Sequence, residues 1–186
     1  MCSYDPCPAG LKATGTYVNV LSWSPDERYL LLRTPSVAAG IDYEGTEHYV
    51  IDVVTGDLTK LGPAVESTSW RTWAAPHTLY FASGKVSGQP GTPPTRLRQW
   101  SPESGINDLT PADRAAVSPS YDAFGQRVLY VEDVPGTPRR IASFDTRSGA
   151  SRVLAADSKY AIDGVRISVD GTALLQLRRE PPRRSA

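Results

Sequence analysis

This sequence has little of what covalent or metal chemistry requires. Its 186 residues include two cysteines, two histidines and one methionine. Neither His48 nor His77 is close in sequence to Cys2 and Cys7, and two thiols alone do not complete the tetrahedral shell of zinc. The formal net charge is zero, which does not indicate binding to nucleic acid or to an anionic membrane surface. We therefore expect no metal and no cofactor.

Long apolar runs are missing as well. No run approaches the length of a membrane span, and the N-terminus lacks the apolar stretch of a signal peptide. Two alternatives follow: a cytoplasmic protein, or an extracytoplasmic one whose leader is absent from this sequence. Three states of Cys2 and Cys7 fit these two alternatives: two free thiols, a local disulfide in an oxidising compartment, or a lipid attached to Cys2.

Helical periodicity is also absent, because no stretch of a dozen residues repeats its apolar positions at helical spacing. The sequence has instead a degenerate repeat of roughly 44 to 50 residues. Its clearest copy begins at Trp23-Ser24-Pro25-Asp26 and continues with apolar segments at 29–32, 49–52 and 58–61. Four short strands in each copy are typical of a β-propeller blade.

Further copies follow the first. The second spans 69–109, the third spans 117–154, and the fourth begins at Val165 and stops after two strands. Residues 4–11 resemble the third and fourth strands of the other copies. The sequence thus predicts an all-β protein, a β-propeller with about four blade equivalents of four antiparallel strands. One blade would be shared between the N-terminal and C-terminal ends.

Three arrangements would satisfy this pattern. The chain closes alone as a four-bladed ring, two chains join half blades into an eight-bladed ring, or the chain is part of a longer propeller. Closed rings leave no exposed sheet edge. We place the propeller domain at 1–178 and a basic, proline-containing tail at 179–186, where Pro181-Pro182 and three arginines oppose strand formation. Monomer and homodimer both remain open.

The first copy carries a family resemblance. The run Trp23-Ser24-Pro25-Asp26-Glu27-Arg28-Tyr29-Leu30 resembles the WSPDG-x-x-hydrophobic repeat of TolB-like, WD40-like propellers, often called PD40 repeats. The same repeat occurs in the propellers of prolyl-oligopeptidase-type peptidases. The resemblance covers nearly the whole chain and implies the same fold. The second copy departs from it at Arg71-Thr72, and the family's rings have roughly six to eight blades.

Catalytic motifs are not evident. A serine hydrolase needs a Gly-x-Ser-x-Gly elbow between a strand and a helix. Gly84-Lys85-Val86-Ser87-Gly88 places its serine one position too late and lies in a Gly/Pro-rich insertion. The carboxylates of Asp42, Glu44 and Glu47 lack the spacing and glycine of a calcium loop. We expect a chain that is not itself an enzyme.

The aromatic residues divide into two groups. Trp23 and Trp70 are interpreted as equivalent repeat positions that pack between blades. Two insertions, 35–46 and 83–95, each follow a second strand and should emerge on one face of the ring, where binding loops commonly lie. The candidate partner-binding residues are Tyr43, Trp73, Trp100 and Tyr121.

These observations favour a non-catalytic β-propeller that works as a binding or scaffolding module for a protein or peptide partner. The alternative is the substrate-gating propeller of an oligopeptidase-like serine hydrolase, separated from its catalytic domain. Nucleic acid is not an expected partner, and no membrane span is expected.

Overall fold

The structure is a computed structural model built from repeated antiparallel sheets. It describes residues 19–34, 47–63, 70–84, 95–134, 137–156, 160–168 and 170–179. The first blade contains β1 (Asn19–Trp23), β2 (Tyr29–Thr34), β3 (Glu47–Asp52) and β4 (Leu58–Pro63). These four strands form one sheet in chain order. The described residues contain strands and no helix, as the sequence predicts.

Two more complete blades repeat the same order. The second contains β5 (Arg71–Ala74), β6 (Thr78–Ser83), β7 (Arg96–Ser101) and β8 (Gly105–Asp108). The third contains β9 (Ala115–Asp122), β10 (Arg127–Asp133), β11 (Arg140–Asp145) and β12 (Ser151–Ala156). Each forms a separate four-stranded sheet, and all pairs are antiparallel.

The last sheet is a half-blade of two strands, β13 (Tyr160–Ile167) and β14 (Ala173–Arg179). This confirms the prediction that the fourth copy stops after two strands. The strands expected near residues 4–11 and the insertion at 35–46 lie outside the described residues, as does most of the insertion at 83–95.

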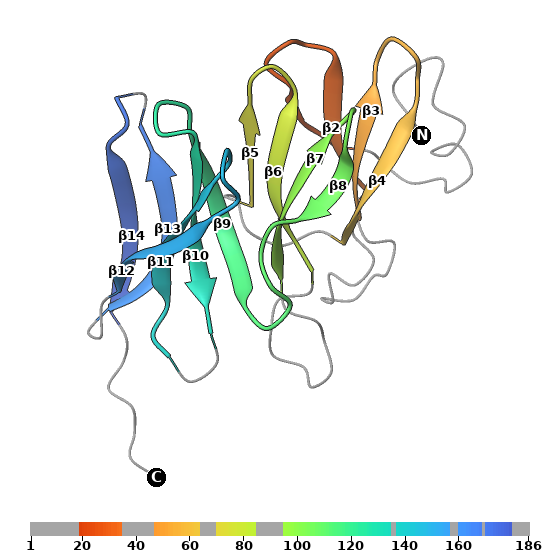
Figure 1. Cartoon of the computed structure of the whole chain (residues 1–186). Coiled ribbons are helices and arrows are strands. Elements are labelled where there is room, and N and C mark those ends of the chain that lie inside the picture. The colour runs from red at the N-terminus through yellow and green to blue at the C-terminus, as the bar shows by residue number, and fades with distance from the viewer. Residues whose placement is uncertain are drawn as a thin grey trace.

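The blades follow one another along an arc. Figure 1 shows the first blade and the half-blade at opposite sides of the molecule, with the second and third blades between them. The first strands β5 and β13 both pack against β9, so the first strands of neighbouring blades lie along one side of the arc. In a β-propeller this is the side that faces the central axis.

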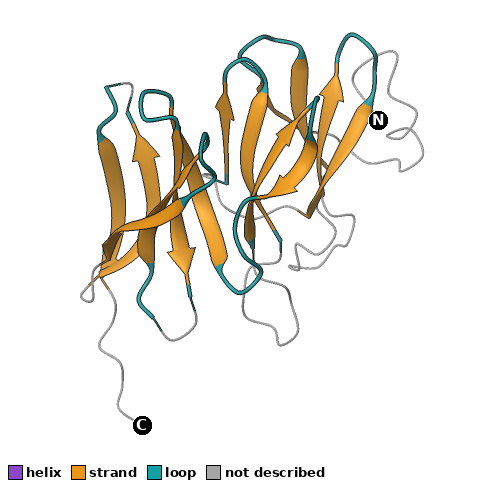
Figure 2. Cartoon of the chain, viewed as in Figure 1, coloured by secondary structure: helices purple, strands orange, loops and turns teal. Residues whose placement is uncertain are grey.

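Hairpin turns gather at one end of the sheets. The turns that join the first two strands of the blades lie together at the top of Figure 2. We call this end the turn face, defined by residues 24–28, 75–77, 123–126 and 168–172. The opposite end, where second strands lead into third strands, is called the loop face.

Three of the four hydrophobic clusters of the described residues lie in the seams, the interfaces between neighbouring blades, and the fourth, around Leu30 and Leu32, lies within the first blade. In the first seam, Leu31 and Val50 of the first blade pack with Leu79 and Phe81 of the second. Equivalent clusters fill the seams between the second and third blades and between the third blade and the half-blade. Burial alternates along β3, as expected for a strand with one face on a seam. No described helix is long and apolar enough to cross a membrane.

Candidate functional site

The structure places three of the four aromatic candidates in seams. Trp100 is buried, and Trp73 lies edge-on to it, with ring centroids 6.3 Å apart. Tyr121 is half-buried and stacks on Tyr80 of the preceding blade at 5.6 Å. Tyr43 lies outside the described residues. What the structure shows of the other three is packing, and their role in partner binding stays a prediction.

The strand registers correct one interpretation of the repeat. Trp23 pairs with Leu30 in β2, and Trp73 pairs with Leu79 in β6. Trp23 is therefore equivalent to Trp73, and the predicted equivalence of Trp23 with Trp70 is wrong. The alignment was misled because tryptophan stands at both position 70 and position 73, and the strand register selects the second of them.

The same position recurs in the remaining blades. In the third blade Tyr121 pairs with the second residue of β10, and in the half-blade Ile167 pairs with Ala173 of β14. Trp73, Tyr121 and Ile167 each pack against the core of the preceding blade. We call this repeated position the seam residue.

A hydroxyl group of the preceding blade accepts a hydrogen bond from each of these three residues. The donor–acceptor pairs are Trp73 Nε1 to Ser22 Oγ (3.0 Å), Tyr121 N to Thr72 Oγ1 (3.3 Å) and Ile167 N to Ser120 Oγ (2.9 Å). Each acceptor directly precedes the seam residue of its own blade. One hydroxyl–apolar pair on each first strand thus links successive blades.

Trp23 is the seam residue of the first blade, and it is 48% exposed. The expectation that Trp23 packs between blades is therefore wrong for the described residues. No blade precedes the first one in the described part of the chain, whereas the strand partner of Trp23, Leu30, is buried in a cluster of the first blade. Trp70, the other tryptophan in that expectation, is 4% exposed and lies in the first seam.

Basic side chains meet at the loop-face end of the first seam. The imidazole of His48 stacks on the indole of Trp70, with ring centroids 3.7 Å apart and an interplanar angle of 19°. The guanidinium of Arg71 lies 5.0 Å from the Trp70 ring and donates to the Leu21 carbonyl at 3.3 Å. Arg33 is the strand partner of His48 in β2. We call His48, Trp70, Arg71 and Arg33 the His48 cluster.

The His48 cluster holds positive charge without a matching carboxylate. Among the described residues neither Arg33 nor Arg71 forms an ion pair, and the buried atoms His48 Nε2 and Arg33 Nε have no hydrogen-bond partner. Burial, and then the charges of Arg33 and Arg71, lower the pKa of His48 to about 3. Neutral imidazole and two guanidinium groups at one place form a local environment suited to an anion.

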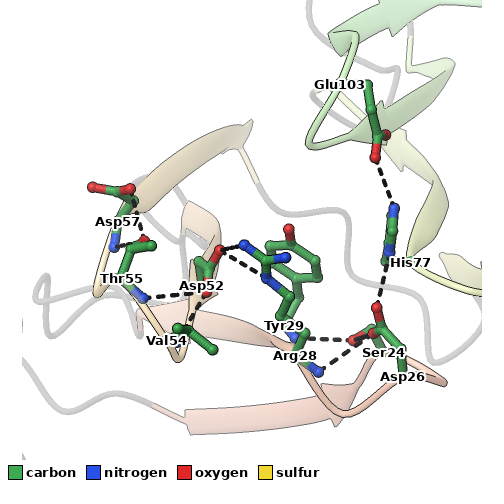
Figure 3. A network of polar contacts seen from close by, with 10 residues as sticks. All are labelled: Ser24, Asp26, Arg28, Tyr29, Asp52, Val54, Thr55, Asp57, His77 and Glu103. Atoms are coloured by element: carbon green, nitrogen blue, oxygen red, sulfur yellow. Dashed lines mark hydrogen bonds and ion pairs between the residues drawn. The ribbon is translucent and has the colours of Figure 1, made fainter.

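A second polar group spans the same seam on the turn face. His77 of the second blade lies between two carboxylates, Asp26 of the first blade and Glu103 of its own (Figure 3). The distances are 2.8 Å from Nδ1 to Asp26 Oδ2 and 2.9 Å from Nε2 to Glu103 Oε1. The hydrogen bond to Asp26 is the main cause that raises the pKa of His77. The Asp26–His77–Glu103 group therefore links the first two blades electrostatically.

Serine, aspartate and histidine are all present in this group, but their order does not suit nucleophilic catalysis. Ser24 Oγ donates to Asp26 Oδ1 at 2.5 Å and accepts from Tyr29 N at 2.9 Å. The carboxylate thus stands between the hydroxyl and His77 (Figure 3). A base must lie within hydrogen-bond reach of the hydroxyl that it activates. These contacts hold the turn in shape and join the blades.

The carboxylates that the sequence analysis grouped do not meet as a metal site among the described residues. Glu47 forms an ion pair with Lys60 at 3.1 Å, whereas Asp42 and Glu44 lie outside the described residues. No group of three or more potential metal ligands occurs in the part of the chain that the structure describes.

The His48 cluster is the functional candidate that sequence reasoning missed. Arg33 and His48 come from neighbouring strands, and Arg71 comes from the next blade. The sequence around each of them predicts a β-strand and nothing more, and only the tertiary structure brings them together. One signal was available: His48 and Arg33 interrupt the apolar strands of the first blade at the same end.

The chain resembles known proteins in its fold but not detectably in its sequence. The sequence matches no protein-family profile, and no curated protein is detectably similar to it. A protein described as a TolB from Agrobacterium tumefaciens is similar in structure, with a TM-score of 0.53 and 17% identity over 89% of this chain and 59% of that one. TolB from Acinetobacter baumannii has a TM-score of 0.52 and 16% identity, over 90% of this chain and 39% of that one.

A third similar structure is the β-propeller domain of the Trilobed protease from Pyrococcus furiosus, which has an open velcro topology. Its TM-score is 0.52, with 15% identity over 88% of this chain and 50% of that one. This chain thus spans less than two thirds of each structure. The likeness confirms the predicted fold, a TolB-like β-propeller arrangement similar to a peptidase propeller.

Proposed function

We propose that this chain is a non-catalytic β-propeller module that binds a protein or peptide partner, and that the His48 cluster receives a carboxylate of that partner. The observation that carries the proposal is the pair of guanidinium groups without a carboxylate at the buried His48. An unsatisfied buried polar atom costs about 1–3 kcal/mol. A bound carboxylate would offset that cost for Arg33 and His48 together.

The partner's chemistry follows from the same contacts. Arginine guanidinium groups present several N–H donors in a plane that fits a carboxylate, and an aromatic neighbour such as Trp70 adds apolar contact. Trp and Arg are common at the centres of protein interfaces. An acidic peptide segment fits these groups better than an apolar one.

The earlier aromatic candidates belong to this proposal in different ways. Trp73 and Tyr121 are half-buried in seams, so a partner that lies along the first strands would contact their exposed parts. Trp100 is 3% exposed and would act by supporting Trp73. Tyr43 is proposed as a contact from the insertion at 35–46.

A peptide titration tests the proposal. The ¹⁵N-labelled chain is titrated with an acetylated, amidated hexapeptide that contains three glutamates, and with its glutamine counterpart. We expect the glutamate peptide to shift the Trp70 indole and Arg71 Nε–H signals of the wild type. Arg71→Ala should lower the affinity of the chain for this peptide at least tenfold. Arg147→Ala, at an exposed arginine in the turn between β11 and β12 that donates to Gln126, is the matched control and should bind normally.

Equal shifts with both peptides, or shifts that survive Arg71→Ala, would contradict a carboxylate site. Failure of both peptides to shift any signal would contradict the proposed acidic partner.

A second candidate function is the gating propeller of an oligopeptidase-like serine hydrolase. The likeness to the Trilobed protease propeller favours it. Under this alternative the chain would bind a hydrolase domain and restrict its access to substrates. A coding sequence for a serine hydrolase next to that of this chain, and co-purification of the two products, would support the alternative over the first proposal.

A further inference from the structure

The first blade is polar near the loop face at positions where the next two blades are apolar. The second-to-last pair between its second and third strands is Arg33–His48. The equivalent pairs in the next two blades are apolar and at most 3% exposed: Ala82–Leu97 and Val131–Ile141. Burying polar groups costs free energy, so this exchange indicates a ligand rather than packing.

The second blade carries a pair of guanidinium groups at the same end. Arg96 and Arg98 share one carboxylate, that of Asp108, at 2.5 and 2.7 Å. Arg96 uses Nη1 for this contact and Arg98 uses Nε, whereas a guanidinium group has several further N–H donors. Both side chains are partly exposed, so they can also donate to a ligand.

The third blade repeats this arrangement. Arg114 and Arg140 share the carboxylate of Glu132, at 3.3 and 2.5 Å. Glu132 is buried, whereas the side chain of Arg114 is 42% exposed. Arg140 is equivalent to Arg96, because each belongs to the pair nearest the loop face between the second and third strands. Two blades thus present two guanidinium groups around one carboxylate.

The guanidinium pair of the second blade lies close to the His48 cluster. Gly62 is the strand partner of His48 in β4. A Cβ atom at Gly62 would lie 3.2 Å from Ser83 Oγ and 3.7 Å from Arg98 Nη1. The guanidinium of Arg98 therefore approaches the backbone beside His48 across the first seam.

A backbone contact also joins the second and third blades at this end. Ala116 N donates to Thr95 O at 2.8 Å, so β9 begins beside the start of β7. The arginines thus form three pairs that follow one another along the loop face. These three arginine pairs are Arg33 with Arg71, Arg96 with Arg98, and Arg114 with Arg140.

Positive charge exceeds negative charge around the three arginine pairs. Among the described side chains, their six guanidinium groups face three carboxylates, those of Asp108, Asp113 and Glu132. Glu47 and Asp133 form ion pairs with basic residues outside the three pairs. Duplex nucleic acid carries about one charge per 1.7 Å, and the carboxylates within the pairs would repel it. A segment with a few separate carboxylates fits this modest excess better.

We propose that the loop face binds an acidic segment of a protein partner, which runs along the three arginine pairs from the first seam to the third blade. This rests on the proposed function, because the His48 cluster receives the first carboxylate of the segment. The second and third pairs each receive another. Two guanidinium groups around one carboxylate still carry a net positive charge, which a second carboxylate neutralises.

Isothermal titration calorimetry with two peptides tests the proposal. The short peptide is the acetylated, amidated hexapeptide with three glutamates. The long peptide has the same end groups and twelve residues in which glutamate alternates with serine, so it spans about 40 Å when extended. The long peptide should bind the wild type at least tenfold more tightly than the short one. Added sodium chloride should reduce this advantage.

Two variants assign the gain in affinity to the second and third pairs. Arg96→Gln and Arg114→Gln each leave the shared carboxylate its other arginine, so the circular dichroism spectrum should stay that of the wild type. Each should lower the affinity for the long peptide at least threefold and leave that for the short peptide unchanged. Arg28→Gln is the matched control, because Arg28 also pairs with a carboxylate, at 2.9 Å, and is 48% exposed, but lies on the turn face. It should bind both peptides normally.

The outcomes separate this proposal from the proposed function. A long peptide that binds no more tightly than the short one would overturn the proposal and leave the carboxylate site at the His48 cluster standing. So would a gain that survives both variants, or one that Arg28→Gln lowers equally. If Arg71→Ala changes the affinity for neither peptide, the proposed function fails as well. A twelve-nucleotide single-stranded DNA that binds more tightly than the long peptide would overturn the acidic protein segment in favour of a nucleic acid.

Discussion

His48 lies face to face with Trp70 across the seam between the first two blades, with ring centroids 3.7 Å apart. The stack buries an imidazole between charged neighbours, Arg33 and Arg71, that both oppose its protonation. A titratable group that is neutral in the folded chain and free to protonate in the unfolded chain makes stability depend on pH. The direction of that dependence can be worked out from the pKa values.

The first prediction concerns acid. The pKa of His48 is about 3 in the folded chain, against 6.5 for the free side chain. Between these values the unfolded chain binds the additional proton, so the free energy of unfolding should fall as pH falls from 6.5 toward 3. One such histidine contributes up to about 1.4 kcal/mol for each pH unit. His48→Phe keeps an aromatic ring on Trp70 but removes the titration.

Urea unfolding of the wild type and of His48→Phe at pH 4, 5, 6 and 7 checks this prediction. The difference between the two free energies should change with pH below 6.5 and stay constant above it. Parallel curves over the whole range would show that His48 does not titrate on unfolding.

The second prediction concerns His77 and has the opposite sign. Its pKa is raised by the carboxylates of Asp26 and Glu103. Its contribution to stability should be complete below pH 6.5 and should be lost as pH rises through the folded-state pKa. Because the group is partly exposed, the effect should stay below about 1 kcal/mol. His77→Gln should therefore destabilise the chain at pH 6 and have little effect at pH 9, measured by urea unfolding.

Salt provides the control for His77. Added sodium chloride at pH 6 should reduce the difference between the wild type and His77→Gln, because exposed charges are screened. A difference that is equal at pH 6 and pH 9 would mean that packing against Tyr29, 5.6 Å away, and not charge, is lost.

The third prediction concerns the hydroxyl–apolar pair of the first seam. Ser22→Ala and Trp73→Phe each remove the bond from Trp73 Nε1 to Ser22 Oγ. A double-mutant cycle should give a coupling free energy of about 1 kcal/mol. Trp73→Ala should instead cost about 2–4 kcal/mol, because it also opens the seam. Trp73→Phe is therefore the better variant for binding experiments. Additive free energies of unfolding in the cycle would contradict the pairing.

The fourth prediction concerns Gly125 in the turn of the third blade. A Cβ there would lie 2.6 Å from Asp122 Oδ2 and 2.9 Å from Arg127 Nε. Asp122 cannot swing aside, since it accepts hydrogen bonds from the N–H groups of Phe124 and Gly125 and from Arg127. Gly125→Ala should thus cost about 1–3 kcal/mol.

Asp122→Ala separates this clash from other effects of Gly125→Ala. In the Asp122→Ala background the carboxylate is gone, so the additional alanine should cost much less than in the wild type. An equal cost in both backgrounds, by urea unfolding, would contradict the steric explanation.

Much of the fold follows from the sequence. The apolar segments 29–32, 49–52 and 128–131 became strands of the predicted kind because strand pairing within a blade is local in the chain. The equivalence of the tryptophans could not be predicted correctly. It depends on the strand register, and because tryptophan stands at both position 70 and position 73, the sequence alone does not show which of them matches Trp23.

The candidate site was not predictable, for a physical reason. Arg33, His48 and Arg71 each lie near the end of a strand. Polar residues are common at such positions, so none of the three indicates a site by itself. They form one site because the second blade packs on the first. This packing stacks Trp70 on His48 and places Arg71 beside Trp70. Contacts between blades depend on tertiary packing that local patterns do not encode.

The number of neighbouring blades should determine where the chain opens first. The second and third blades each have a neighbour on both sides, whereas the first blade and the half-blade each have one in the described arc. Local opening should therefore spread inward from both ends. Amide hydrogens of β9 and β10 should exchange most slowly and those of β1 and β14 most quickly. Joining the first blade and the half-blade into a ring would remove this gradient, so the exchange profile distinguishes an open arc of blades from a closed ring.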